Sequence, residues 1–369
     1  MNDLYIADQP ALADFCARLQ GAPQLALDTE FVREQTYYPQ LGLIQIAGPD
    51  RVASIDPMAL PSLDPLLERI YDPTVTKLLH AGQQDLEIFF HLCGAAPAPV
   101  FDTQVAALAL GQGDQIGYAP LVRQMLGVEL DKAHTRADWR RRPLALEWLR
   151  YAADDVRYLP ELYRQQRAAL EERGWLDALA EDFQRLCHPD RYRLQPRESW
   201  RRIREHSRLR GAQRAVLREL AAWREEQASL HDRPRRWIMG DAVLVELTRR
   251  MPKTLDDLQH IRGLPPATWQ RHGETLLARI AAARAEPPEQ WPTPSRRLLL
   301  NPEQEAQVDD LLTLITTRAN QYHIPIRSVA NREDVERLLT GEDSPLRHGW
   351  RAALIGRELQ ADLGGDSRR

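Results

Sequence analysis

Five side chains in three separated stretches of this sequence have the chemistry of a metal-dependent hydrolytic site. Asp28 and Glu30 stand in LALDTEF, an otherwise apolar stretch where charged residues are unusual for a buried strand. Asp85 stands in HAGQQDLEIF, and Tyr151 and Asp155 stand four residues apart in YAADD. Carboxylate oxygens are the ligands that Mg²⁺ and Mn²⁺ prefer in proteins. Four converging carboxylates would repel one another unless cations lay among them, so the pattern predicts two divalent ions of the kind that promote phosphodiester hydrolysis.

The first two acids belong to a predicted strand. Side chains two residues apart in a strand point to the same face, so Asp28 and Glu30 project together and Thr29 points to the opposite side. Two further strands follow after connections that are too short for all three strands to be parallel. We therefore expect a mixed sheet that includes three predicted strands, 25–31, 41–47 and 51–56.

The other three candidate residues lie on predicted helices. Asp85 falls in the first turn of a helix that directly follows a strand predicted at 75–80. Tyr151 and Asp155 share one face of a helical stretch predicted over 143–173, because residues four apart in a helix lie one above the other. Strands followed by helices that pack on them indicate an α/β domain.

Each feature also has a simpler explanation. An acid pair in a strand is typical of a solvent-facing edge, and an Asp in the first turn of a helix compensates the helix dipole. A Tyr and an Asp four residues apart are typical of a solvated helix face. Only the convergence of all five side chains would favour the metal site.

Composition indicates a water-soluble protein of two or three domains. The chain has 369 residues, of which 43% are hydrophobic and 28% charged. No apolar stretch reaches the 18 or so residues of a membrane span, and the N-terminus has no basic start followed by an apolar segment. The three cysteines are far apart in sequence and form no CxxC pair, so we expect reduced thiols and a cytoplasmic protein.

Charge and proline content divide the chain. Residues 1–199 hold 20 basic and 29 acidic residues, a net of −9, whereas residues 200–297 hold 20 and 12, a net of +8. Polar, Pro-containing stretches at 188–199 and 286–295 are predicted linkers. The expected domains are an α/β domain and two helical domains, at 1–200, 206–288 and 296–369.

At this point the motifs resemble a known family, the DEDD 3′→5′ exonucleases of the Tyr subclass, and within it ribonuclease D. Asp28-Thr29-Glu30 matches the first family motif, Asp85 the second, and Tyr151 with Asp155 the third. The longer stretches that carry the resemblance are DTEFVREQTYYPQLGLIQ, LLHAGQQDLEIF, LDKAHTRADWRRRPL and YAADDVRYL. The resemblance implies a ribonuclease H-like fold with a mixed sheet flanked by helices. It further implies two all-α HRDC helical-bundle domains, the second of them divergent.

The resemblance also implies an activity and roles for the five residues. Asp28 would bridge two divalent ions, Mg²⁺ or Mn²⁺. Glu30 and Asp155 would complete the site that holds the attacking water, Asp85 would hold the second ion, and Tyr151 would orient the water and help to deprotonate it. The expected reaction is release of 5′-mononucleotides from a free RNA 3′ end. Precursors of tRNA are the implied substrates, and a monomer that binds no membrane is the implied state.

Further residues are candidates for substrate contact. His80 and Gln84 stand near Asp85 in the sequence. Thr29 is expected to pack by its side chain and to offer the terminal nucleotide a backbone contact at most. Arg136 and Trp139 stand in an arginine-rich segment that could contact phosphates, and Trp139 could stack on a base. The alternative for His80 is that it simply ends a strand. The alternative for the arginine-rich segment is an ordinary surface loop.

Three arginines spaced four apart indicate a positive helix face in the basic segment. Arg210, Arg214 and Arg218 are predicted to hold the RNA backbone, with ion pairs to neighbouring glutamates as the alternative. Deletion of 206–369 is therefore expected to weaken substrate binding and to preserve phosphodiester cleavage.

Two other functions remain open from the sequence. The acids do not distinguish RNA from DNA, so a DNA-directed 3′→5′ exonuclease is one alternative, and a non-catalytic RNA-binding protein is another. A helicase is disfavoured because the sequence has no GxxxxGK[ST] phosphate-binding loop.

Overall fold

The computed structural model describes residues 3–131, 137–293 and 300–356. Two compact units make up the chain: the first combines residues 1–32, 41–192 and 298–369, and the second combines 33–40 with 193–297. The prediction of three consecutive domains is a different division, and it stays a prediction. None of the described helices combines the length and the apolar character that crossing a bilayer requires.

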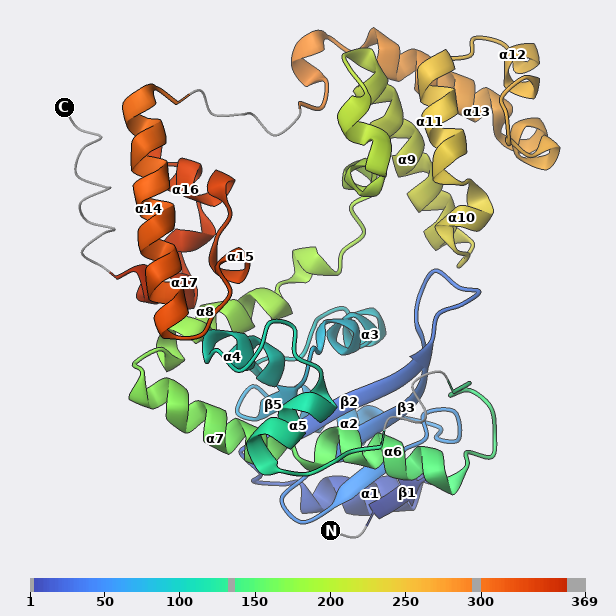
Figure 1. Ribbon diagram of the computed structural model, residues 1–369. Helices are drawn as coiled ribbons and strands as arrows, with labels where there is room; N and C mark the ends of the chain where they lie inside the picture. Colours follow the sequence, from blue (N-terminus) through green and yellow to red (C-terminus); the bar gives the residue numbers. More distant parts are fainter. Residues whose placement is uncertain (1–2, 132–136, 294–299, 357–369) are drawn as a thin grey trace. The chain divides into compact units, whose positions relative to one another are not determined.

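A six-stranded sheet forms the centre of the first unit (Figure 1). The strands stand in the order β1-β4-β3-β2-β5-β6. β4 runs parallel to β1 and antiparallel to β3, while β5 runs parallel to both β2 and β6, so the predicted mixed sheet is confirmed. The strands are β1 (Asp3–Ile6), β2 (Gln24–Val32), β3 (Gln40–Ala47), β4 (Val52–Ile55), β5 (Thr76–Leu79) and β6 (Val100–Asp102).

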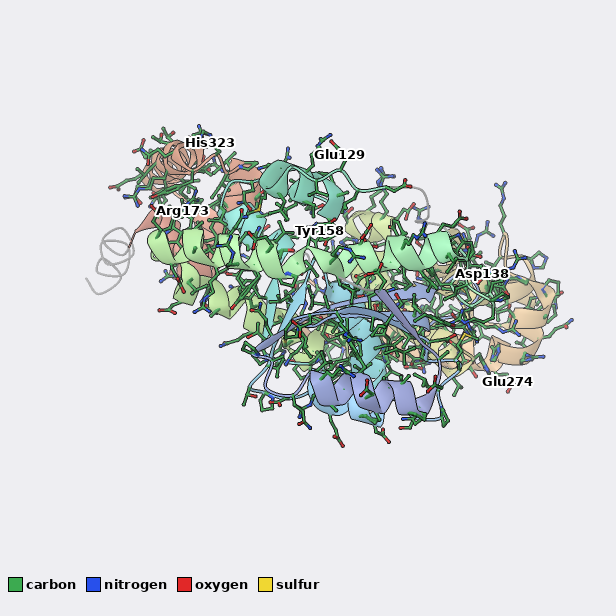
Figure 2. The ribbon with its side chains drawn as sticks, turned by 90° about the horizontal axis from the view of Figure 1, so that it is seen from below. Glu129, Asp138, Tyr158, Arg173, Glu274 and His323 are labelled. Atoms are coloured by element: carbon green, nitrogen blue, oxygen red, sulfur yellow. The ribbon has the colours of Figure 1, made fainter. Side chains whose placement is uncertain are left out.

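Helices cover both faces of this sheet. α6 packs on β2 and β4, and α7 packs on β5 and β2. Figure 2 shows α6 and α7 end to end along one side of the sheet, joined at the labelled Tyr158, with α1 on the opposite side. The helices of this domain are α1 (Gln9–Arg18), α2 (Asp64–Ile70), α3 (Gln83–Cys93), α4 (Thr103–Ala109), α5 (Tyr118–Leu126), α6 (Leu146–Arg157), α7 (Leu159–Glu172) and α8 (Leu176–Cys187).

Most of the predicted elements are present, with two differences. The helical stretch predicted over 143–173 is two helices, because Pro160 lies at the start of α7 and a proline removes a backbone donor from a continuous helix. The edge strand β1 and helix α1 were not predicted. β1 has only four residues, and its burial depends on β4, which lies about fifty residues later in the chain.

The C-terminal helices pack into the core of the first unit. Trp350 of α17 (Gly349–Ile355) lies against Trp175, and the Gly349 amide donates to Glu181 of α8 at 2.8 Å. Gly111 is required where the segments meet, because a Cβ there would stand 1.9 Å from the carbonyl oxygen of Tyr322. The other elements of this region are α14 (Pro302–Gln321), α15 (Ile326–Val329), α16 (Arg332–Leu339) and η5 (Pro345–Arg347).

The second unit is helical and includes the connection between β2 and β3. Tyr37 of this connection is only 7% exposed, and its hydroxyl donates to Glu225 at 2.5 Å. Arg235 lies over the Tyr37 ring and donates to both Glu225 oxygens, and Asp232 accepts from the amide of Tyr37. The elements are η2 (Pro196–Arg202), η3 (Arg204–Arg208), α9 (Ala212–Leu230), α10 (Arg235–Ile238), α11 (Asp241–Arg250), α12 (Leu255–Gln259), α13 (Pro266–Ala285) and η4 (Pro288–Gln290), after η1 (Pro189–Arg191) of the first unit.

Candidate active site

Strand β2 and helix α6 bring three carboxylates together. One oxygen from each of Asp28, Glu30 and Asp155 lies within 4.8 Å of the others, and all three side chains are partly exposed. Asp28 and Glu30 alternate on β2 as predicted, and Asp155 reaches them because α6 packs on β2 through a buried stripe that includes Ala152 and Val156. The sequence-based expectation of convergence is met for these three acids.

Asp85 joins the cluster from the first turn of α3. Its carboxylate accepts a hydrogen bond from the Thr29 hydroxyl, and its charge repels that of Asp28. The turn before α3 is held by Asp102, whose carboxylate accepts from the amides of Ala81 and Gly82 at 3.1 and 2.9 Å. Asp102 therefore fixes the helix start that carries Asp85, a role that sequence reasoning had not assigned.

The carboxylates raise one another's pKa. Burial, followed by repulsion from Asp155 and Asp85, raises the pKa of Glu30 to about 9. Burial is also the main cause that raises the pKa of Asp155 to about 7 and that of Asp85 to about 6. The pKa of Asp28 rises well above its usual value, because of burial and then of repulsion from the other three acids. Without cations the cluster therefore retains protons at neutral pH.

The donor set fits divalent cations. It consists of carboxylate oxygens alone, which suit Mg²⁺ or Mn²⁺ rather than softer metals. Neighbouring acids raise the pKa values of these four carboxylates, and hydrogen bonds from Thr29 and Tyr151 are the interactions that lower those of Asp85 and Asp155. Bound cations would supply the missing positive charge.

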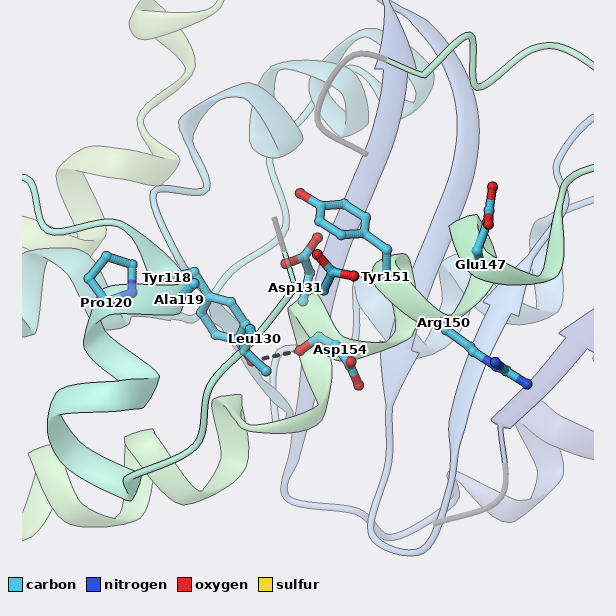
Figure 3. Close-up of a pocket in the computed structure, with 10 residues that line it drawn as sticks. Tyr118, Ala119, Pro120, Leu130, Asp131, Glu147, Arg150, Tyr151 and Asp154 are labelled. Atoms are coloured by element: carbon cyan, nitrogen blue, oxygen red, sulfur yellow. Dashed lines mark hydrogen bonds between the residues drawn. The ribbon is translucent and has the colours of Figure 1, made fainter. Parts of the chain in front are cut away.

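A cavity of about 680 Å³ opens beside the cluster. Figure 3 shows Tyr151 and Asp154 of α6 and Tyr118 of α5 among the residues that line it, with a hydrogen bond between Tyr118 and Asp154. Asp155 also lines the cavity. Burial and the carboxylates nearby hold the pKa of Tyr151 above its usual range, so its hydroxyl stays protonated in the metal-free protein. A protonated hydroxyl can orient a water or phosphate oxygen by donating a hydrogen bond.

Tyr118 is a cavity residue that the sequence did not reveal. Its hydroxyl donates to the Asp154 carbonyl at 3.0 Å and accepts from the Tyr158 amide at 3.1 Å. It thereby joins α5 to the break between α6 and α7, next to Asp155. No pattern around Tyr118 signals this role, because its partners lie 36 and 40 residues later.

Thr29 differs from its prediction. We expected only packing from its side chain, but the buried hydroxyl donates to Asp85. The prediction of a contact with the terminal nucleotide stays untested.

His80 and Gln84 have different surroundings. Both ring nitrogens of His80 are engaged inside the protein, one with the Thr103 hydroxyl at 2.8 Å and one with the Ile116 carbonyl at 3.0 Å. Burial lowers the pKa of His80, so the ring is neutral and serves packing rather than substrate contact. Gln84 is exposed at the start of α3 beside Asp85, and its predicted role stays a prediction.

Trp139 is buried, so the prediction that it stacks on a base is wrong. Its side chain is 2% exposed, and its ring stacks against that of Tyr151 with centroids 6.4 Å apart. Arg142 holds this segment in place: it forms an ion pair with buried Asp56 at 2.6 Å and donates to the Trp139 carbonyl at 2.7 Å. Gly42 is required here because a Cβ would lie 2.7 Å from that carbonyl oxygen. Trp139 and Arg142 therefore support Tyr151.

Arg136, the other residue of this segment predicted to contact the substrate, lies outside the described residues.

The predicted arginine face is interrupted. Arg210 precedes α9, so only Arg214 and Arg218 share that helix. Arg218 donates to both carboxylate oxygens of Glu286 at 2.6 Å, and its side chain is 12% exposed. This ion pair, together with the hydrogen bond from Arg218 to Glu219 at 3.0 Å, agrees with the alternative of pairing to glutamates. The RNA-binding roles of Arg210, Arg214 and Arg218 stay predictions.

Comparison with known protein families covers both parts of the chain. A family described as 3′-5′ exonuclease matches residues 4–171, and a family described as HRDC domain matches residues 213–280. The helical region 300–356, predicted as a second HRDC domain, lies outside both matches.

Individual relatives match the chain over nearly its whole length. It is 40% identical to ribonuclease D of Sphingobium indicum, with 96% of this chain and 92% of that protein covered. It is 35% identical to ribonuclease D of Escherichia coli, with 97% and 98% covered. The crystal structure of E. coli RNase D, described as an exoribonuclease involved in structured RNA processing, matches with a TM-score of 0.84 at 34% identity over all of both chains.

Proposed function

This chain belongs to the ribonuclease D family, and we propose that the carboxylates around Asp28 form its catalytic centre and that tRNA precursors are among its substrates. The enzymes of the family are hydrolytic 3′→5′ exoribonucleases. The mixed-sheet fold, the enzyme class and the RNA substrate predicted from the sequence are thereby confirmed. The exonuclease fold also implies the use of divalent metal ions.

In this proposal Asp28, Glu30 and Asp155 would hold one divalent ion, and Asp85 would contribute to holding a second. When bound, Mg²⁺ or Mn²⁺ would lower the pKa of the attacking water and stabilise charge on the departing 3′ oxygen. The acids that retain protons would release them when an ion binds, so binding would be favoured as pH rises.

The chain's own groups orient the reactants. The Tyr151 hydroxyl donates a hydrogen bond that aligns the attacking water, and the ring of Trp139 keeps Tyr151 in this position. The cavity beside Tyr151 and Asp155 receives the terminal nucleotide. Hydrolysis between the last two nucleotides then releases a 5′-monophosphate.

One observation carries this proposal: three carboxylate groups offer oxygens within 4.8 Å of one another, and their pKa values are raised rather than lowered. Structural acids in folded proteins are normally paired with cations or hydrogen-bond donors. A cluster that leaves its charges unbalanced is typical of a functional site.

Product analysis on a tRNA precursor with a 3′ trailer tests the proposal. We expect stepwise shortening from the 3′ end and release of 5′-monophosphates with Mg²⁺ or Mn²⁺, and none with a chelator. Asp28→Asn and Asp155→Asn should each lower the rate by about 1,000-fold, since an ion that loses a ligand loses several kcal/mol of transition-state stabilisation. Asp177→Asn on α8 is a control of the same chemistry, because Asp177 is exposed and does not line the cavity.

Other outcomes would favour the alternatives. Equal degradation of a matched DNA strand would favour a DNA-directed exonuclease. Tight RNA binding without hydrolysis in any divalent ion would favour a non-catalytic RNA-binding protein. Retained activity in both Asn variants would contradict the assigned centre.

The monomeric state stays a prediction, which sedimentation of the purified protein would test.

A further inference from the structure

We propose that an arginine-lined cavity in the second unit binds phosphate groups of the RNA strand upstream of its 3′ end. The inference rests on the proposed function, because it assumes an RNA substrate. The cavity has a volume of about 530 Å³, and all its lining residues belong to the second unit. Its charged residues are five arginines and three acids: Arg33, Arg202, Arg224, Arg235, Arg236, Glu34, Glu225 and Asp241.

Two of the arginines are neutralised by acids inside the cavity wall. Arg235 donates to both oxygens of Glu225, at 2.5 and 2.6 Å. Arg224 donates to Asp241 at 2.5 Å. We assign these pairs a structural role, because Glu225 and Arg224 are only 2% and 5% exposed.

Counted over the whole lining, five arginines stand against three acids, which gives the cavity a net charge of +2. Arg202 is 71% exposed along its side chain and lies 3.9 Å from Glu225, too far for a hydrogen bond. Arg236 is exposed on α10. Both side chains can therefore swing toward an anion that enters the cavity.

Arg224 adds a donor that has no partner. Its Nε is buried, and no described residue accepts a hydrogen bond from it. A buried donor without an acceptor costs free energy. An acceptor that reached into the cavity would satisfy this group, and guanidinium groups match phosphate oxygens in geometry and charge.

The wall of the cavity that comes from residues 33–37 is held firmly. Tyr37 is fixed by Glu225, Arg235 and Asp232, and Arg33 donates to the Tyr37 carbonyl at 2.9 Å. Arg33 follows the catalytic residue Glu30 by three positions in the chain. A strand that binds here would contact residues directly continuous with β2, the strand that carries the first two acids.

Equilibrium binding of a single-stranded RNA oligonucleotide in chelator tests the inference, because binding is then read without hydrolysis. In the full-length double variant Arg202→Ala/Arg236→Ala, we expect affinity to fall about tenfold near 0.1 M salt. The slope of log affinity against log salt should fall by about 1.4, the value for two lost phosphate contacts on a single strand. Both side chains are exposed, and a thermal melt of each variant verifies folding.

The matched control is Arg249→Ala/Arg250→Ala on α11, which removes the same charge from the same unit outside the cavity. An equal loss of affinity and slope in this control would overturn the inference, since the effect would then be one of net charge. So would an unchanged slope in the cavity variant. Competition by 5′-AMP or inorganic phosphate against the oligonucleotide separates the two sources of phosphate. If either compound binds the cavity while RNA affinity does not depend on Arg202 and Arg236, the site serves a free phosphate compound and the RNA assignment is wrong.

The two hypotheses fail separately. If RNA is not hydrolysed but its binding depends on the cavity, the proposed function fails and the inference stands. If hydrolysis follows the carboxylates but binding ignores the cavity, only the inference fails.

Discussion

The carboxylate cluster around Asp28 and the ion-pair network around Glu225 are two groups of charges with little access to solvent, one in each unit of the molecule. Burial and repulsion raise the pKa of Glu30 to about 9, so its charge is unfavourable in the folded metal-free state. Glu225 is even less exposed, at 2%, yet its pKa is lowered because Arg235 and Tyr37 hydrogen-bond to it. The first group requires ligands from outside the chain, and the second is complete within it. The sign of the pKa shift, rather than burial or charge, separates the functional cluster from the structural one.

The largest effect on stability is expected when the complete network loses its central acid. Glu225→Ala leaves the Arg235 guanidinium and the Tyr37 hydroxyl buried without their acceptor, which should lower the free energy of unfolding by about 3–5 kcal/mol. Urea denaturation of the full chain measures this loss. Glu226→Ala is the matched control, since Glu226 is 40% exposed and its pair with Arg279 should contribute about 1 kcal/mol or less. If both variants lost the same free energy of unfolding, the buried Glu225 network would contribute no more to stability than an exposed ion pair.

The incomplete cluster should respond to pH in the opposite sense to ordinary acids. The folded pKa of Glu30 is about 9 and its usual value is 4.5, so between these values the folded state binds more protons than the unfolded state. Stability in chelator should therefore fall as pH rises, by about 2.7 kcal/mol between pH 6 and 8 for one retained proton. Thermal unfolding across this range measures the slope, and saturating Mg²⁺ or Mn²⁺ should flatten it. A stability that rose with pH in chelator would contradict the unbalanced cluster.

A smaller effect is expected from the support beneath Tyr151. Trp139→Phe keeps an aromatic ring but loses part of the stacked contact, which is worth about 0.5–1.5 kcal/mol. We expect kcat to fall roughly 2- to 10-fold with KM unchanged, because Tyr151 acts on the reacting water and not on the bulk of the RNA. Trp175→Phe, which alters the packing against Trp350 instead, is the control. A change in KM alone would indicate that Trp139 affects substrate binding.

The smallest effect is expected from the arginine that already has a partner. Arg218→Ala should leave RNA affinity in chelator within about twofold of wild type, since Glu286 occupies its guanidinium. Glu286→Ala breaks the same pair from the other side and provides the comparison. If Arg218→Ala weakened RNA binding as much as Arg202→Ala/Arg236→Ala, the ion pair with Glu286 would not keep Arg218 from binding RNA.

The sequence was sufficient for the features that depend on neighbours in the chain. Alternation placed Asp28 and Glu30 on one face of β2, and helical spacing placed Tyr151 with Asp155 on α6. The convergence of these residues was a hypothesis from their chemistry that the family resemblance supported, because no local pattern brings α6 onto β2. The β5–α3 unit that carries Asp85 was also predicted closely.

The features that were missed depend on partners far away in the sequence. Asp85, the acceptor of the Thr29 hydroxyl, lies 56 residues later, and Glu286, the partner of Arg218, lies 68 residues later. Arg142 and Asp56 are separated by 86 residues, so nothing near Trp139 showed that an arginine-rich segment would be buried. In each case the side chain is engaged by a partner within the protein that no local pattern indicated.

The expected effect of deleting 206–369 also changes. Residues 298–369 belong to the same compact unit as the sheet, and Trp350 and Leu354 are part of the same hydrophobic core as Trp175 and Phe183. A deletion from 206 therefore opens that core and removes the partners of Tyr37. Loss of activity in such a truncated chain would not separate RNA binding from folding.

The return of the C-terminal helices to the first unit has a consequence for how the protein is made. During synthesis the sheet leaves the ribosome first, followed by the whole second unit, and only then by the segment that contains Trp350. Domains commonly fold in order as they emerge. Here the earliest unit stays incomplete until the last turns of the chain appear, with Trp175 and its neighbours uncovered in the nascent chain. Chaperone binding during translation, and loss of the whole enzyme on premature termination near residue 300, are the costs of this order of assembly.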